Sequence, residues 1–175
     1  MRRSVLVVVA LVTLVAAGCS TTSVATVSTQ APLPAGSQPS PIAKQVCHEA
    51  VKDIASVLGE SATVSTPTWV DHLYSCRYGY PAGSMVLSVK ELSSWAETYA
   101  YFHSLATQLG QSRTLQGLGQ GAFQTTDGSM VVRKDWKVLL VNIQDLPSQF
   151  GVPPTSSGDV AVTVADVILG CWAGD

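Results

Sequence analysis

The chain has 175 residues, which is enough for one folded domain of ordinary size and too few for several. Its formal net charge is −2, and the charged residues, 13% of the total, are dispersed along the sequence. A nucleic-acid-binding surface needs Lys and Arg gathered on one face, so the composition excludes that class of partner. The same balance provides no added electrostatic attraction to anionic lipid headgroups.

The N-terminus has the pattern of an export signal. Arg2 and Arg3 precede an apolar run, Val5–Val15, which is much shorter than the roughly 20 residues of a membrane-spanning helix. Small residues follow, and the segment Ala16–Cys19 resembles a bacterial lipobox, with Ala16 at the position where lipoboxes usually carry Leu. A general secretory signal followed by an incidental cysteine is the alternative interpretation.

The lipobox resemblance implies how the protein is processed and where it resides. Residues 1–18 would be removed as a signal peptide by cleavage between Gly18 and Cys19. Cys19 would carry a diacylglyceryl thioether and an N-acyl chain, with palmitate among the expected groups, and no other cofactor is expected. Each buried methylene contributes about 0.8 kcal/mol, so two or three chains would hold the protein at the extracytoplasmic face of the cell membrane.

Residues 19–43 are predicted to form a tether between the lipid and the folded domain. Ser20–Pro41 contains no charge, nine Ser or Thr residues and four prolines. It lacks the apolar periodicity that would offset the entropy lost on ordering, which is typical of a linker. The first charge after Cys19 is Lys44, where we place the start of one globular domain, residues 44–175.

The first part of this domain is predicted to be a helix followed by two strands. Apolar residues recur at helical spacing over 47–58, with Cys47 on the buried face and Gly59 as the end. Alternation over 72–80 predicts a strand with one aromatic face, and Met85–Lys90 returns as a second strand. Four residues share the aromatic face of the first strand: Tyr74, Cys76, Tyr78 and Tyr80.

A second helix and a hairpin are predicted next. Ser94 and Glu97 match a capping box, and the helix they begin ends at Gly110. Its apolar stripe is Trp95, Tyr99, Phe102, Ala106 and Leu109. After a short strand near Phe123, residues 129–144 predict a hairpin about Asp135 whose second, Val/Leu/Ile-rich strand is central in a sheet.

The last predicted element is a helix that Ser157 caps after a loop, Leu146–Ser157. Its apolar stripe is Val160, Val164, Val167 and Cys171. The order αββα-ββ(β)-α predicts an α+β fold, with a single antiparallel sheet of about five strands and helices packed on one face.

No motif indicates catalysis or a metal site, so we predict that the protein is not an enzyme and holds no metal. His48, His72 and His103 lack metal-ligand spacing and are better explained as surface residues. Gly117–Gly121 is similar to a phosphate loop only in composition. It opens no predicted helix and no Lys-Ser or Lys-Thr follows it, so a glycine-rich turn is the better interpretation.

Two aromatic stripes, on the strand at 72–80 and on the helix at 95–109, are the candidate ligand-binding feature. Packing of the two faces on each other is the simpler explanation, because aromatic residues dominate small cores. The alternative is a pocket between them, lined by Tyr78 and Phe102, for an apolar or glycosyl ligand. With Cys19 committed to lipid, the remaining cysteines allow one internal bridge, between Cys47 and Cys76 or from either to Cys171.

Together these features resemble a group of small actinobacterial cell-envelope lipoproteins of unknown function, and in layout the lipid-anchored proteins and kinase sensor domains of mycobacterial envelopes. The resemblance rests on the lipobox, the tether, Cys47 before Leu58-Gly59, Cys76 on the next strand, and Gly-Leu-Gly before Val-Val-Arg-Lys. It implies a disulfide between Cys47 and Cys76 and no catalytic residues. We expect an anchored domain that binds an envelope protein or lipid. A carrier of a hydrophobic or glycolipid ligand is the alternative, and an envelope enzyme is third.

Overall fold

The computed structural model describes residues 35–172, so the predicted signal peptide, the lipobox with Cys19 and most of the tether lie outside the described residues. The helices are α1 (Pro41–Gln45), α2 (Ala50–Leu58), α3 (Trp95–Leu109) and α4 (Ser157–Cys171). The main sheet contains β1 (Thr63–Val64), β2 (Thr68–Val70), β3 (Leu73–Tyr80), β4 (Gly83–Glu91), β5 (Gln111–Leu115), β6 (Gly121–Thr125), β7 (Met130–Lys134) and β8 (Lys137–Asp145). A separate ribbon contains β9 (Gln149–Phe150) and β10 (Thr155–Ser156).

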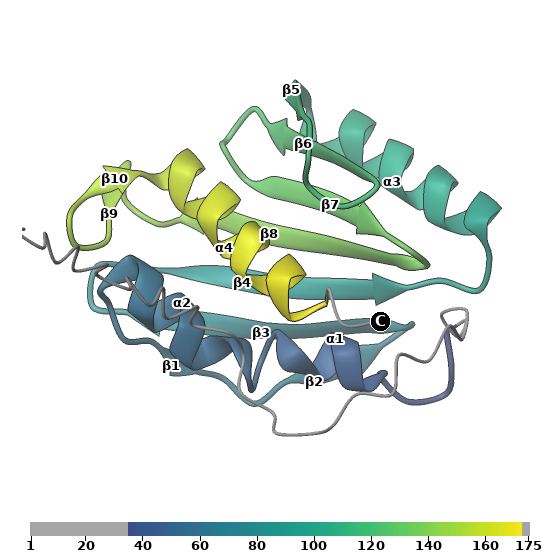
Figure 1. Ribbon diagram of the computed structural model, residues 1–175, viewed down its shortest axis with the longest axis horizontal. Coiled ribbons are helices and arrows are strands. Elements are labelled where there is room, and N and C mark those ends of the chain that lie inside the picture. The colour runs from purple at the N-terminus through teal and green to yellow at the C-terminus, as the bar shows by residue number, and fades with distance from the viewer. Residues whose placement is uncertain (1–34, 173–175) are drawn as a thin grey trace, which may run out of the picture.

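The predicted α+β class is confirmed, with a larger antiparallel sheet than expected (Figure 1). Its order is β1-β3-β4-β8-β7-β6-β5, with β2 also paired to β3, so it has eight strands where the sequence predicts about five. The unpredicted strands β1, β2 and β5 are short and mostly exposed, and they lack the buried alternation that marks a strand in sequence. β8 is central, as its composition predicts.

Helices cover both faces of this sheet, so the prediction that they pack on one face is wrong. On β8, Leu139 and Val141 belong to the main core, which α2 and α4 cover. Val138 points to the opposite face and packs in a second core beneath α3. A strand with consecutive buried apolar residues requires cover on both sides, because neighbouring side chains point to opposite faces. Figure 1 shows α2 and α4 together in front of the sheet.

The predicted first helix begins later than expected, at Ala50 instead of Cys47, and a separate short helix, α1, precedes it. α1 and α2 are joined by a turn, and Cys47 lies in this turn, buried, instead of on a helix. The Tyr78 hydroxyl donates a hydrogen bond of 2.6 Å to the Val46 carbonyl, which diverts that acceptor from the next turn of helix. Gly59 ends α2 in the left-handed conformation, as predicted (φ 65°).

The folded domain also includes residues that the sequence assigns to the tether. The buried carboxylate of Glu91 accepts hydrogen bonds from the Ser40 backbone N–H (3.0 Å) and from the Ser40 hydroxyl. Ala43 is fully buried in the main core, and the Ala35 N–H donates to the Leu92 carbonyl (3.1 Å). The domain therefore begins at least nine positions before Lys44.

Glu91→Ala is expected to release residues 35–40 from the domain. The variant leaves the Ser40 N–H without its acceptor, which costs about 1–3 kcal/mol of unfolding free energy. Urea denaturation should show this loss, and limited proteolysis should cut before Lys44 sooner than in the wild type. Asp166→Ala removes an exposed carboxylate from α4 and serves as the control. Equal proteolysis of wild type and Glu91→Ala would contradict the role assigned to Glu91.

Candidate functional site

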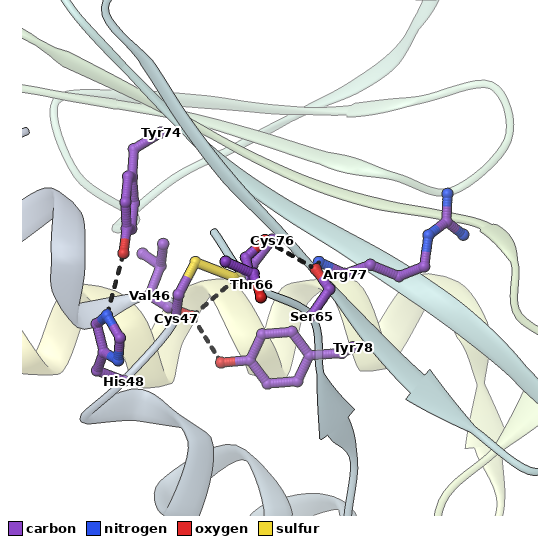
Figure 2. Close-up of a disulfide and its surroundings, with 9 residues drawn as sticks. All are labelled: Val46, Cys47, His48, Ser65, Thr66, Tyr74, Cys76, Arg77 and Tyr78. Carbon is purple, nitrogen blue, oxygen red and sulfur yellow. Dashed lines mark hydrogen bonds between the residues drawn. A yellow bond between two sulfur atoms is a disulfide. The ribbon is translucent and has the colours of Figure 1, made fainter. Parts of the chain in front are cut away.

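The structure joins Cys47 and Cys76 in a disulfide, with Cα atoms 6.0 Å apart (Figure 2). This confirms the pairing that the resemblance implies and rules out a bridge from either cysteine to Cys171. Both cysteines are buried, at 4% and 3% exposure, so the bridge is not accessible to a solvent thiol. Cys171 is half-buried at the end of α4, with its Sγ 4.0 Å from the Asp53 Oδ2. The bridge pins the α1–α2 turn to β3.

The tyrosines beside the bridge are structural. The pKa of the Tyr78 hydroxyl is raised above its usual value, mainly because the side chain is buried. Burial also raises the pKa of Tyr80, to about 12. The Tyr74 hydroxyl lies 3.1 Å from the Nε2 of His48 (Figure 2). His48, His72 and His103 are all exposed, in agreement with the surface interpretation. Within residues 35–172, no group of three or more His, Cys, Asp or Glu is placed to hold a metal ion.

The two proposed ligand-lining residues do not meet. Tyr78 is fully buried in the main core, on the face that α2 and α4 cover. Phe102 packs on the opposite face, with its ring 5.1 Å from that of Phe123. Because the sheet lies between the two aromatic stripes, the pocket expected between them does not form. The stripes also do not pack on each other, so the simpler interpretation is wrong as well.

Helix α3 buries only part of its predicted stripe: Phe102, Ala106 and Leu109 pack in the second core, whereas Trp95 and Tyr99 do not. Its boundaries are as expected: the Ser94 hydroxyl accepts from the Glu97 N–H (3.2 Å), and Gly110 follows its last residue. However, Trp95 and Tyr99 are 48% and 55% exposed. The residues directed at the sheet are Thr98, Tyr101, Phe102, Leu105, Ala106 and Leu109. The apolar pattern does not identify Thr98 as a buried residue, because its side chain is polar. Its hydroxyl donates a hydrogen bond to the Ser94 carbonyl (2.7 Å).

Arg133 of β7 holds the exposed aromatic residues in place. Its guanidinium carbon lies 4.9 Å from the ring centroid of Trp95, 5.7 Å from that of Tyr99 and 6.0 Å from that of Phe102. Cation–π contacts of this kind contribute about 0.5–1 kcal/mol each at exposed sites. We call Trp95, Tyr99, Phe102 and Arg133 the aromatic patch. Arg133 was not a candidate from sequence, although its position two residues after Val131 places it on the α3 face of β7.

The glycine-rich segment joins two strands, β5 and β6, whereas a phosphate loop joins a strand to a helix. In this structure the segment supports Arg133. The backbone carbonyl of Gln120 accepts a hydrogen bond from the Nη2 of Arg133 (2.7 Å), and the backbone N–H of Gln120 donates one to the Arg133 carbonyl (2.8 Å). Gly119 has φ 54°, and a Cβ there would lie 2.6 Å from the Arg133 carbonyl oxygen. Glycine is required for this close approach. The prediction of a glycine-rich turn is confirmed.

An open depression of about 340 Å³ lies between the same loop and the end of α4. Its lining includes Gly117, Leu118, Lys134 and Asp166. The Lys134 ammonium already donates to the Trp172 carbonyl, so it is committed to the fold. Lys134 and Arg133 are neighbours on β7 and point to opposite faces of the sheet. The depression is therefore separate from the aromatic patch.

The aromatic patch is the described surface best suited to binding. Trp and Tyr combine a large apolar ring with one polar group, which suits them to surfaces that are apolar on one side and wet on the other. The exposed His103 ring lies 4.2 Å from the Tyr99 ring and extends the patch along α3. Among the described helices, none is both long and apolar enough to cross a membrane.

Comparisons with protein-family models, with curated proteins and with solved structures find no match to this chain. The aromatic patch and the N-terminal motif are therefore the features that bear on its function.

Proposed function

We propose that the chain is an exported lipoprotein, anchored through Cys19, whose α+β domain is a non-catalytic binding module at the extracytoplasmic face of the membrane. The observation that carries the binding role is the exposure of Trp95 and Tyr99. Burying a large apolar side chain contributes about 1.5–3 kcal/mol, so two half-exposed rings forgo much of that stabilisation in the free domain. Arg133 keeps them in one arrangement, which lowers the entropy cost of a contact.

The compartment is supported by the disulfide and by the N-terminal motif. Disulfides persist outside the cytoplasm and are rare within it. The lipobox at Ala16–Cys19 and the resemblance to actinobacterial envelope lipoproteins support the same location. The carrier alternative is not favoured, because Tyr78 and Phe102, which were to line its cavity, are separated by the sheet.

Cys19→Ser is expected to abolish lipidation. The protein then remains uncleaved or is released from the membrane, because the serine hydroxyl cannot form the thioether and the acyl chains supply the anchoring free energy. Membrane fractionation and intact mass measurement check both effects, with Val57→Ala, at an exposed site on α2, as the control.

The wild-type protein should show a mass increase for acyl groups on the peptide that begins at Cys19. An unchanged processed mass and membrane retention in Cys19→Ser would contradict the anchor. Recovery of a Cys19–Cys171 disulfide would contradict it too, because a thioether sulfur cannot form a disulfide. Non-reducing peptide mapping of the wild-type protein tests that outcome directly.

A further inference from the structure

We propose that the aromatic patch lies in the headgroup region of the membrane that carries the lipid anchor, and thereby orients the domain on the bilayer. This inference rests on the anchored function proposed above and names the partner of the patch. Three features lead to it: the point where the chain enters the domain, the length of chain between that point and Cys19, and the chemistry of the exposed rings.

The chain enters the folded domain beside the first turn of α3. The Ala35 N–H donates to the Leu92 carbonyl at 3.1 Å, and Leu92 is three residues before Trp95. The Trp69 Nε1 donates to the Ser37 carbonyl at 3.1 Å and holds the following residues against β2. In Figure 1 the segment before α1 reaches the end of the molecule where β4 leads into α3. The aromatic patch therefore lies at the end from which the anchored chain departs.

The chain outside the described domain is short compared with the domain. Cys19 and Ala35 are 16 positions apart, and a coil of that length spans on average about 20–25 Å. A folded domain of this size has a radius of gyration of about 14 Å, so its two ends lie farther apart than that span. An anchor on Cys19 thus keeps the end with Ala35 close to the bilayer.

The chemistry of the patch matches a membrane interface. Trp and Tyr are enriched where a bilayer meets water, because their rings are apolar and each has one hydrogen-bonding group. Arg side chains reach such interfaces with an apolar stem and a charged end. The contact uses ring insertion and not net charge, which agrees with the mildly acidic composition. The charged and titratable groups near the rings are Arg133, Glu97 and His103.

A protein partner fits this surface less well. A stable protein interface buries about 800 Å² on each partner and has an apolar centre. Here two exposed rings stand beside the small exposed residues Ala96 and Ala100, and the nearby Gln120 is exposed and polar. The anchor also raises the effective concentration of the bilayer at the patch. A contact that is too weak to hold a free protein on the membrane is therefore sufficient to orient an anchored domain.

The test uses the mature, acylated full chain reconstituted into vesicles of phosphatidylcholine and phosphatidylglycerol, with lipids brominated near the headgroup as fluorescence quenchers. The wild type should lose more tryptophan fluorescence than Trp95→Phe, which keeps an aromatic ring but removes that fluorophore. The difference should persist in 1 M salt, because ions at that concentration screen charge attraction beyond roughly 3 Å and leave the insertion of apolar rings intact.

A second measurement uses the unacylated Cys19→Ser chain without residues 1–18, so that the apolar run at Val5–Val15 makes no contribution, purified and added to the same vesicles. Trp95→Ala together with Tyr99→Ala should lower its partition into the vesicles by roughly tenfold or more. Val152→Ala is the matched control: Val152 is 61% exposed and lies beside the end of α2, where its N–H donates to the Leu58 carbonyl. This control should leave partition unchanged.

The outcomes separate the two proposals. An acylated wild-type protein with no Trp95-dependent quenching overturns the membrane contact and leaves the anchor intact. Absence of acylation on Cys19 overturns the anchored function itself. A photoreactive residue at position 99 that yields protein adducts and no lipid adducts in the native envelope would also overturn the inference, in favour of a protein partner.

Discussion

Replacement of both bridged cysteines, as Cys47→Ala with Cys76→Ala, is expected to lower the free energy of unfolding by about 3.5 kcal/mol. The bridge closes a loop with a sequence separation of 29, and its loss restores that conformational freedom to the unfolded chain. Alanine is preferred to serine, because both sites are buried and a hydroxyl there would need a partner. The melting temperature should fall by roughly 10 °C or more.

Urea and thermal denaturation measure this effect, with Val57→Ala, at an exposed site on α2, as the control that leaves the Cys47–Cys76 bridge in place. The double variant should retain the secondary structure of the wild type below its lower transition, since the bridge acts mainly on the unfolded state. An unchanged transition would mean that the Tyr78–Val46 hydrogen bond and the surrounding core are sufficient to pin the turn. It would contradict the stabilising role given to the disulfide.

Stability is expected to fall above about pH 10, and the buried Tyr78 and Tyr80 are the largest expected contributors. Burial raises the pKa of Tyr80 to about 12 and raises the pKa of Tyr78 as well. Both phenols keep their protons in the folded state where the unfolded chain loses them. Their contribution is therefore complete below the unfolded pKa of about 10, and it is lost as the pH rises toward the folded pKa.

The expected slope is up to about 1.4 kcal/mol per pH unit for each tyrosine between its unfolded and its folded pKa. Urea denaturation between pH 8 and pH 12, without added thiol, gives this slope. Tyr80→Phe is the matched variant for this test. The Tyr80 hydroxyl is buried and has no hydrogen-bond partner within residues 35–172, so its removal should cost little unfolding free energy at neutral pH. The variant should show a shallower slope than the wild type, and an equal slope would refute the assignment to Tyr80.

Only part of the aromatic patch is evident from the sequence. Trp95 and Tyr99 belong to the predicted apolar stripe of α3, of which Phe102, Ala106 and Leu109 do pack on the core. Helical spacing groups the residues of one face, and it does not tell where along that face burial ends. Arg133 follows Trp95 by 38 positions, and the contact between them exists only because α3 packs across β7. A local pattern contains no information about such a pair.

The amino-acid sequence by itself determined the local elements of this protein. The boundaries of α3, the hairpin turns beside β4 and β8, the buried face of β3 and the central place of β8 all follow from periods, caps and turn residues that act over a few positions. The Cys47–Cys76 pairing followed from a resemblance, since three cysteines leave it open.

Tertiary structure alone decided the rest. It placed Cys47 in a turn before the first predicted helix, where Tyr78, from a distant strand, donates a hydrogen bond to the Val46 carbonyl. It drew residues 35–43 into the domain, because the buried Glu91 needs donors that Ser40 supplies. It placed α3 and α4 on opposite faces of the sheet, because β7 and β8 are apolar on both sides. Each outcome depends on a buried polar group or an apolar face finding its partner far along the chain, and that pairing is settled only when the whole core forms.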